Sequence, residues 1–121
     1  HLVPLSPQVV GMLRQLRELT NGHYLFPGSG ALGVTSQNTM IFALYRMGYH
    51  SRLTVHGFRG TASTILNENG FNPDHIERQL AHVEENKVRG AYNSAEWLPG
   101  RREMMIWWSG FLDQARVKMA A

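Results

Sequence analysis

Signals for the starts and ends of helices recur along this chain, and they constrain its fold more than any other feature. Ser6-Pro7 and Asn72-Pro73 each combine an N-cap side chain with a proline in the first helical turn. Apolar residues recur at helical spacing between these signals. The sequence therefore predicts a mainly α fold. The expected helices run from Pro7 to about Leu19, from a cap at Thr35 or Ser36 through Met47, from Val55 (capped by Thr54) to Asn69, from Pro73 to about Ala81, from about Asn86 to Tyr92, and from about Arg101 to Lys118.

The segment before the first helix has a different pattern. His1 to Leu5 reads as a short extended strand, and Pro4 predicts that it lies at a sheet edge or at a strand end. Because the chain starts without methionine at this strand, we expect a piece of a longer protein whose partner strands lie upstream. Residues 21–33 are rich in glycine and proline and predict a loop.

Length and composition fit one domain, residues 1–121, with a modest core. The 43% hydrophobic and 17% charged residues are ordinary for a globular protein. No apolar run approaches the ~20 residues that span a bilayer, so no membrane partner is expected. The chain has no cysteine, which excludes disulfides and thiolate zinc sites. It also has no leader-like start, and together these features favour a cytoplasmic location.

The charges are unevenly distributed along the chain. Between Glu18 and Glu68 there is no acidic residue, whereas Arg46, Arg52 and Arg59 fall in that gap. Such a stretch carries a positive field that suits an anionic partner. A solvated basic face without a ligand is an equally good interpretation of the charge alone.

His56 and Arg59 form the first candidate constellation. Residues three apart share a helix face, so both side chains can reach one ligand. If Thr54 is the cap, His56 lies in the first turn, where free backbone amides and the helix dipole favour an anion such as phosphate. The spacing alone fits a structural histidine beside a surface arginine better, so the wider context decides.

Further motifs follow in a fixed order, and the chain as a whole resembles the phage integrase branch of the tyrosine recombinases. The start, His1 to Ser6, looks like the family's strand leading into a helix. The closing helix is typical of prophage and genomic-island integrases. The motifs are His56-Gly57-Phe58-Arg59-Gly60-Thr61-Ala62-Ser63-Thr64, Ile76-Glu77-Arg78-Gln79-Leu80-Ala81-His82, Ala91-Tyr92-Asn93, and Arg101-Arg102-Glu103-Met104-Met105 with Trp107-Trp108.

The resemblance implies site-specific DNA recombination through a covalent 3′-phosphotyrosyl intermediate. It makes Tyr92 the nucleophile and Arg59 the group that neutralises the phosphate in the transition state. His56 is implied as the proton acceptor or orienting partner of the phenol, whose ordinary pKa is near ~10, and His82 as a hydrogen-bond donor to the phosphate. No metal and no cofactor are implied. Without the resemblance, a lone tyrosine in a short helix is a packing residue.

Several other residues have less specific interpretations. His75 and His82, with Glu77 or Glu84, could suggest a metal site, but the pattern lacks a zinc motif, and His75 is expected to be exposed. The Met and Trp residues of the last helix are expected in a core or an interface. Arg101 and Arg102 are expected to be plain surface charge.

Two catalytic residues that the family carries before the His-x-x-Arg helix are absent from this chain. The family's active site needs an earlier arginine and a lysine on a β-hairpin, and the only lysines here are Lys87 and Lys118. We therefore expect the second half of a catalytic domain, with little or no cleavage on its own. The parent is expected to act on double-stranded attachment-site DNA as a tetramer, and the fragment to be a monomer or dimer. A non-catalytic helical DNA-binding module, a type IB topoisomerase and an inactive prophage remnant are the alternatives.

Overall fold

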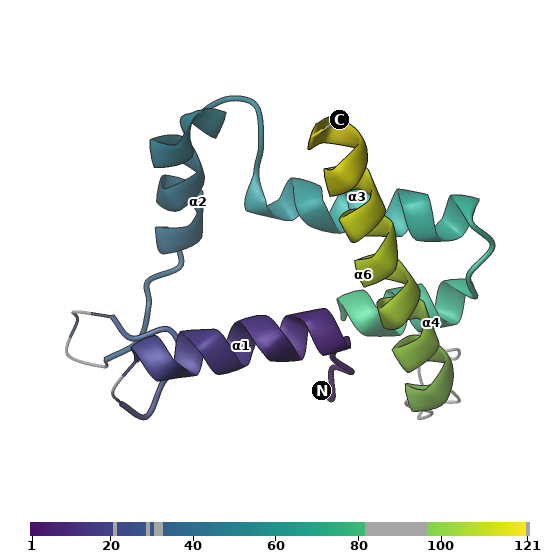
Figure 1. Cartoon of the computed structure of the whole chain (residues 1–121), viewed down its shortest axis with the longest axis horizontal. Helices are drawn as coiled ribbons and strands as arrows, with labels where there is room; N and C mark the ends of the chain where they lie inside the picture. Colours follow the sequence, from purple (N-terminus) through teal and green to yellow (C-terminus); the bar gives the residue numbers. More distant parts are fainter. Residues whose placement is uncertain (21, 29, 31–32, 82–96, 121) are drawn as a thin grey trace, which may run out of the picture. The chain divides into compact units, whose positions relative to one another are not determined.

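The computed structural model describes residues 1–20, 22–28, 30, 33–81 and 97–120. Within these residues the chain is built mainly from helices (Figure 1). The mainly α fold expected from the sequence is confirmed. In chain order the helical elements are α1 (Pro7–Leu19), α2 (Thr39–Leu44), the wide helical turn η1 (Tyr45–Tyr49), α3 (Val55–Glu68), α4 (Pro73–Leu80) and α6 (Leu98–Ala120).

These elements belong to two compact units. The first unit comprises His1–Val9 and the described part of Ser63–Ala121, and the second comprises the described part of Val10–Ala62. The boundaries fall inside α1 and α3, so each of these helices contributes to both units.

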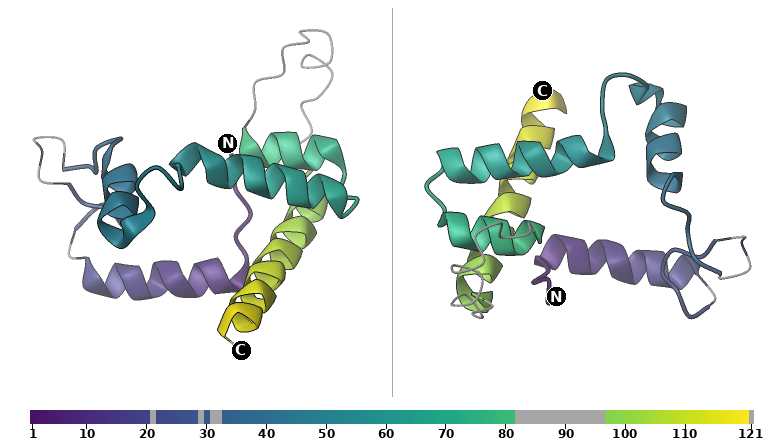
Figure 2. Two further views of the ribbon diagram at one scale, coloured as in Figure 1. Left: turned by 90° about the horizontal axis from the view of Figure 1, so that it is seen from above. Right: turned by 180° about the vertical axis from the view of Figure 1, so that it is seen from behind.

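The core of the first unit lies between the end of α3, α4 and α6 (Figures 1 and 2). Leu66, Ile76 and Met104 are buried there, one from each helix. Burying a side chain of this size stabilises the fold by about 1.5–3 kcal/mol. Half-buried apolar side chains surround these three. Those from α6 are Met and Trp residues, which were expected in a core or an interface. The surrounding side chains are Phe71, Leu80, Met105, Trp107 and Trp108.

The connection between α3 and α4 follows its sequence signals. Gly70 has a φ of 77°, its N–H donates to Asn67 O, and Phe71 N–H donates to Leu66 O. This pair of hydrogen bonds is the Schellman ending, which favours glycine because its central residue is left-handed. The next helix then starts at Asn72, whose Oδ1 accepts from Asp74 N–H at 2.9 Å. Both predictions, the stop and the new cap, are confirmed.

The strand expected at His1–Leu5 is wrong. These residues form no strand, and among the described residues the β-type pairing is an isolated bridge between Pro27 and Val34. A strand needs the backbone groups of a neighbour, whereas here the Leu2 carbonyl accepts from Arg101 Nη2 at 2.6 Å. The segment is therefore held by a side chain of α6.

The start of α2 also differs from expectation. Thr35 and Ser36 do not cap it; the helix begins at Thr39 with Asn38 in the cap position. Thr35 is committed to the preceding loop, because its N–H and its Oγ1 both donate to Phe26 O, at 3.3 and 2.7 Å. The expected stop is confirmed, since Gly48 has a φ of 86° inside η1, outside the helical range.

The long helix α6 spans 23 residues and was expected to begin at about Arg101. It starts three residues earlier, at Leu98. In the part of the chain that the structure describes, no helix is long and apolar enough to cross a bilayer.

Candidate functional site

The first turn of α3 positions the predicted His-x-x-Arg pair. Thr54 Oγ1 accepts from Gly57 N–H at 2.9 Å, so the predicted cap is confirmed. The first turn contains no acidic residue, which leaves the positive end of the helix dipole uncompensated locally. His56 lies in this turn and is exposed.

Arg59 lies one turn further along α3, on the side of the helix that carries His56. Its side chain is half-buried, and its Nε is buried with no hydrogen-bond partner among the described residues. An arginine donor withdrawn from water is unfavourable unless an acceptor meets it. A phosphate oxygen is a suitable acceptor, because the guanidinium fork matches its geometry.

The other two predicted site residues, His82 and Tyr92, lie outside the described residues. The structure thus brings His56 and Arg59 onto one helix, and the convergence of all four residues stays a prediction. The described chain reaches Ala81, which caps α4 with a φ of 52°, and continues at Trp97, with a φ of 49°, immediately before α6.

The second unit has a net positive formal charge. Five arginines and one glutamate fall in residues 10–62, a formal charge of +4, and the chain's total of +3 leaves −1 for the other unit. Arg46 and Arg52 are exposed, and the Arg52 guanidinium lies 5.7 Å from the centre of the Tyr49 ring. Exposed arginines on a unit of net positive charge can meet phosphate groups without a shape-specific pocket.

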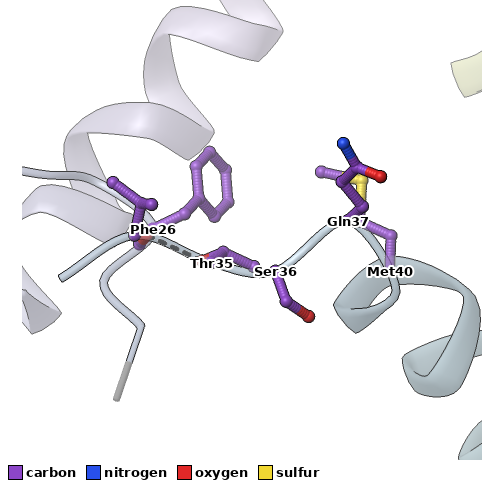
Figure 3. Close-up of a pocket in the computed structure, with 6 residues that line it drawn as sticks. Phe26, Thr35, Ser36, Gln37 and Met40 are labelled. Carbon is purple, nitrogen blue, oxygen red and sulfur yellow. Dashed lines mark hydrogen bonds between the residues drawn. The ribbon is translucent and has the colours of Figure 1, made fainter. Parts of the chain in front are cut away.

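A hollow in the second unit has a different character. Its volume is about 410 Å³, and it lies where the loop from Phe26 meets the start of α2 (Figure 3). None of its lining residues belongs to the predicted site, and three of the six are apolar. The lining residues are Phe26, Val34, Thr35, Ser36, Gln37 and Met40.

His75 was expected to be exposed, and this is wrong. It is half-buried in the first unit, with its ring centre 5.6 Å from that of Trp97. It also lies directly over Gly100, where any Cβ would overlap the imidazole. Within the described residues no three His, Cys, Asp or Glu side chains gather as a metal site would require.

The expectation that Arg101 is surface charge is also wrong, whereas Arg102 is exposed as expected. Arg101 has 0% of its surface exposed. Its Nε and Nη2 donate to Gln79 Oε1 at 3.0 and 2.9 Å, and Nη2 also donates to Leu2 O. One signal could have identified it: Arg101 lies three residues before the buried Met104, on the apolar side of α6.

Comparison with known proteins gives one family match. The model of the phage integrase family matches residues 1–96. The integrase of Enterobacteria phage P4 is 46% identical over 98% of this chain, and the prophage integrases IntS and IntA of Escherichia coli K12 are 40% and 43% identical over 94% and 95% of it. The chain covers 28%, 30% and 28% of the length of these three relatives. No solved structure matches it.

Proposed function

Because the chain belongs to the phage integrase family, we propose that it carries the second half of a catalytic centre that breaks and rejoins DNA during site-specific recombination. Its relatives are named as integrases, and the chain covers less than a third of their length. The activity therefore belongs to the full-length protein of which these residues form a part.

Tyr92 is the proposed nucleophile. Its phenol oxygen attacks the scissile phosphorus and forms a 3′-phosphotyrosyl bond, while the bond to the 5′ oxygen breaks and that oxygen leaves as a hydroxyl after taking up a proton. The phosphodiester energy is kept in the covalent intermediate, so a 5′-hydroxyl of another strand can reverse the step without a nucleotide cofactor. Each strand exchange thus balances without an added reactant.

Arg59, His56 and His82 are proposed to serve the phosphate and the proton. Arg59 places its fixed positive charge at the non-bridging oxygens, where negative charge builds up in the pentavalent transition state. His56 accepts the phenol proton or orients the hydroxyl, and His82 donates a hydrogen bond to the phosphate. These are roles for a site that needs no metal.

The observation that carries the proposal is the pair His56 and Arg59 on the first turns of α3, in a chain of this family. The helix start is capped by Thr54 and free of acidic residues, and the buried Nε of Arg59 has no hydrogen-bond partner in the described part of the chain. The unit to which the pair belongs has a formal charge of +4. Each of these features suits an anionic ligand.

We further propose that the 121-residue chain cannot complete the reaction alone. Its two lysines, Lys87 and Lys118, both follow His56, so it lacks an earlier lysine to protonate the leaving 5′ oxygen. It also lacks an earlier arginine in the expected motif to share the phosphate with Arg59. The full-length protein is proposed to supply both groups and to act on two duplexes as a tetramer.

A suicide DNA substrate tests this proposal. The full-length protein should form a covalent complex with it, the Tyr92→Phe variant should form none, and both should bind the DNA with equal affinity. The 121-residue chain should form little or no complex. A Tyr92→Phe variant that still recombines DNA would rule out Tyr92 as the nucleophile. A full-length protein that binds the DNA but forms no covalent complex would favour a non-catalytic DNA-binding module.

A further inference from the structure

Arg101 ties three parts of the first unit together from a fully buried position. Its guanidinium donates to Gln79 Oε1 through Nε and Nη2, and to the Leu2 carbonyl through Nη2. These acceptors belong to the last turn of α4 and to the segment before α1. A single side chain at the start of α6 therefore fixes two segments that are 22 and 99 residues away in sequence.

A charged side chain is an unfavourable choice for this position if packing is its only task. Taking a guanidinium out of water is costly, and apolar residues of similar volume often replace buried charges without loss of stability. A guanidinium, however, holds its acceptors at defined angles, because its donors lie in one plane. The arrangement thus specifies the direction in which α4 ends more strongly than apolar packing would.

A second contact holds the start of α4 against the same turn of α6. The rings of His75 and Trp97 lie 5.6 Å apart, and Gly100 has no side chain that would keep the imidazole away. Gln79 lies in the last turn of α4, three residues before His82, and Trp97 directly precedes α6, five residues after Tyr92. Both ends of α4 are therefore attached to the start of α6, the last turn through Gln79 and the first turn through His75.

We propose that Arg101 is a positioning residue for strand cleavage. Through Gln79 it fixes the last turn of α4 relative to the start of α6. In the sequence, His82 and Tyr92 both lie between these two helices. The inference rests on the proposed function, because it concerns the placement of the proposed nucleophile. Reactions of this kind depend steeply on alignment, and a misplacement of about 1 Å can slow them about 100-fold.

The test compares Arg101→Gln with Arg102→Gln in the full-length protein. The two substitutions remove the same charge from neighbouring residues, one buried and one exposed. The rate of covalent complex formation is measured in a single turnover at saturating DNA, well below the melting temperature of each variant, and is normalised to folded protein. We expect Arg101→Gln to be about 10- to 100-fold slower with DNA affinity within about twofold of the parent protein, and Arg102→Gln to cleave at the parent rate.

Two substitutions at Gln79 keep the test decisive if Arg101→Gln fails to fold. Gln79→Glu retains an acceptor for the guanidinium and should preserve the rate, whereas Gln79→Leu removes it and should slow cleavage as Arg101→Gln does. Folded Arg101→Gln or Gln79→Leu protein that cleaves at the parent rate would overturn the positioning role and leave the proposed function intact. Cleavage by Tyr92→Phe would instead overturn the proposed function, and the positioning role with it.

Discussion

Gln79 and Arg101 meet through one oxygen, because Gln79 Oε1 accepts from both Nε and Nη2 of the guanidinium, at 3.0 and 2.9 Å. The two residues are 22 positions apart and join α4 to α6 in the first unit. Since Arg101 is fully buried, this contact contributes to stability as well as to placement.

Replacing Arg101 with alanine should lower the free energy of unfolding by about 2–5 kcal/mol, because the change leaves a cavity and deprives Gln79 Oε1 and the Leu2 carbonyl of their donor. Chemical denaturation of the 121-residue chain measures the effect. Arg102→Ala is the matched control, since its side chain is exposed, and it should stay within about 0.5 kcal/mol of the parent chain. Equal losses in the two variants would contradict the burial of Arg101.

The contact between His75 and Gly100 predicts a strong coupling between these positions. Gly100→Ala should destabilise the chain by about 1–3 kcal/mol, because the new methyl group overlaps the imidazole. In a His75→Ala background the same substitution should be harmless, so a double-mutant cycle should give a clear interaction energy. Gly110→Ala, on the same helix with nothing within 4 Å of the new Cβ, is the control and should not destabilise. Additive effects of the His75 and Gly100 changes would be inconsistent with the packing described.

The cap at Thr54 predicts a local effect at the start of α3. Thr54→Ala should destabilise this helix end by about 0.5–2 kcal/mol, because the Gly57 amide loses the acceptor that it now contacts at 2.9 Å. Hydrogen exchange of the Gly57 amide should become faster in Thr54→Ala and remain near the parent rate in Thr54→Ser, which keeps a hydroxyl. Unchanged exchange in the alanine variant would argue against the cap.

The charge of the second unit predicts how DNA binding depends on salt. If Arg46 and Arg52 contact phosphates, Arg46→Gln and Arg52→Gln should each lower the slope of log affinity against log salt by about 1. Arg116→Gln is the control, since Arg116 is exposed on the negatively charged unit, 3.8 Å from Asp113. Titrations of labelled duplex at several salt concentrations give the slopes. A reduction only in Arg116→Gln would place the DNA contact on the other unit.

Sequence patterns predicted most of the fold because most of its helix ends depend on local chemistry. Thr54 and Asn72 cap helices through backbone groups two or three residues away, and Gly70 ends one through its own φ. Arg101 was missed because its acceptors lie 22 and 99 residues away. Thr35 was misassigned as a cap because the Phe26 carbonyl, nine residues earlier, accepts from its hydroxyl.

The candidate site was predictable to a smaller extent. The three-residue spacing of His56 and Arg59 alone places both on one face of a helix. The start of this helix was predicted from Thr54, and that cap is confirmed. The choice of His82 and Tyr92 came from the order of motifs in a family, because nothing in their own neighbourhood distinguishes them from packing residues. The convergence of these four residues depends on how separate segments pack, and no local pattern encodes that.

The most direct test of the account is to identify the residue that becomes attached to DNA. The covalent complex between the full-length protein and a suicide substrate would be digested with protease and nuclease, and the modified peptide sequenced by mass spectrometry. We predict a single adduct, a nucleotide joined through its 3′-phosphate to the Tyr92 oxygen. An adduct on any other residue, or one joined through a 5′-phosphate, would contradict the account.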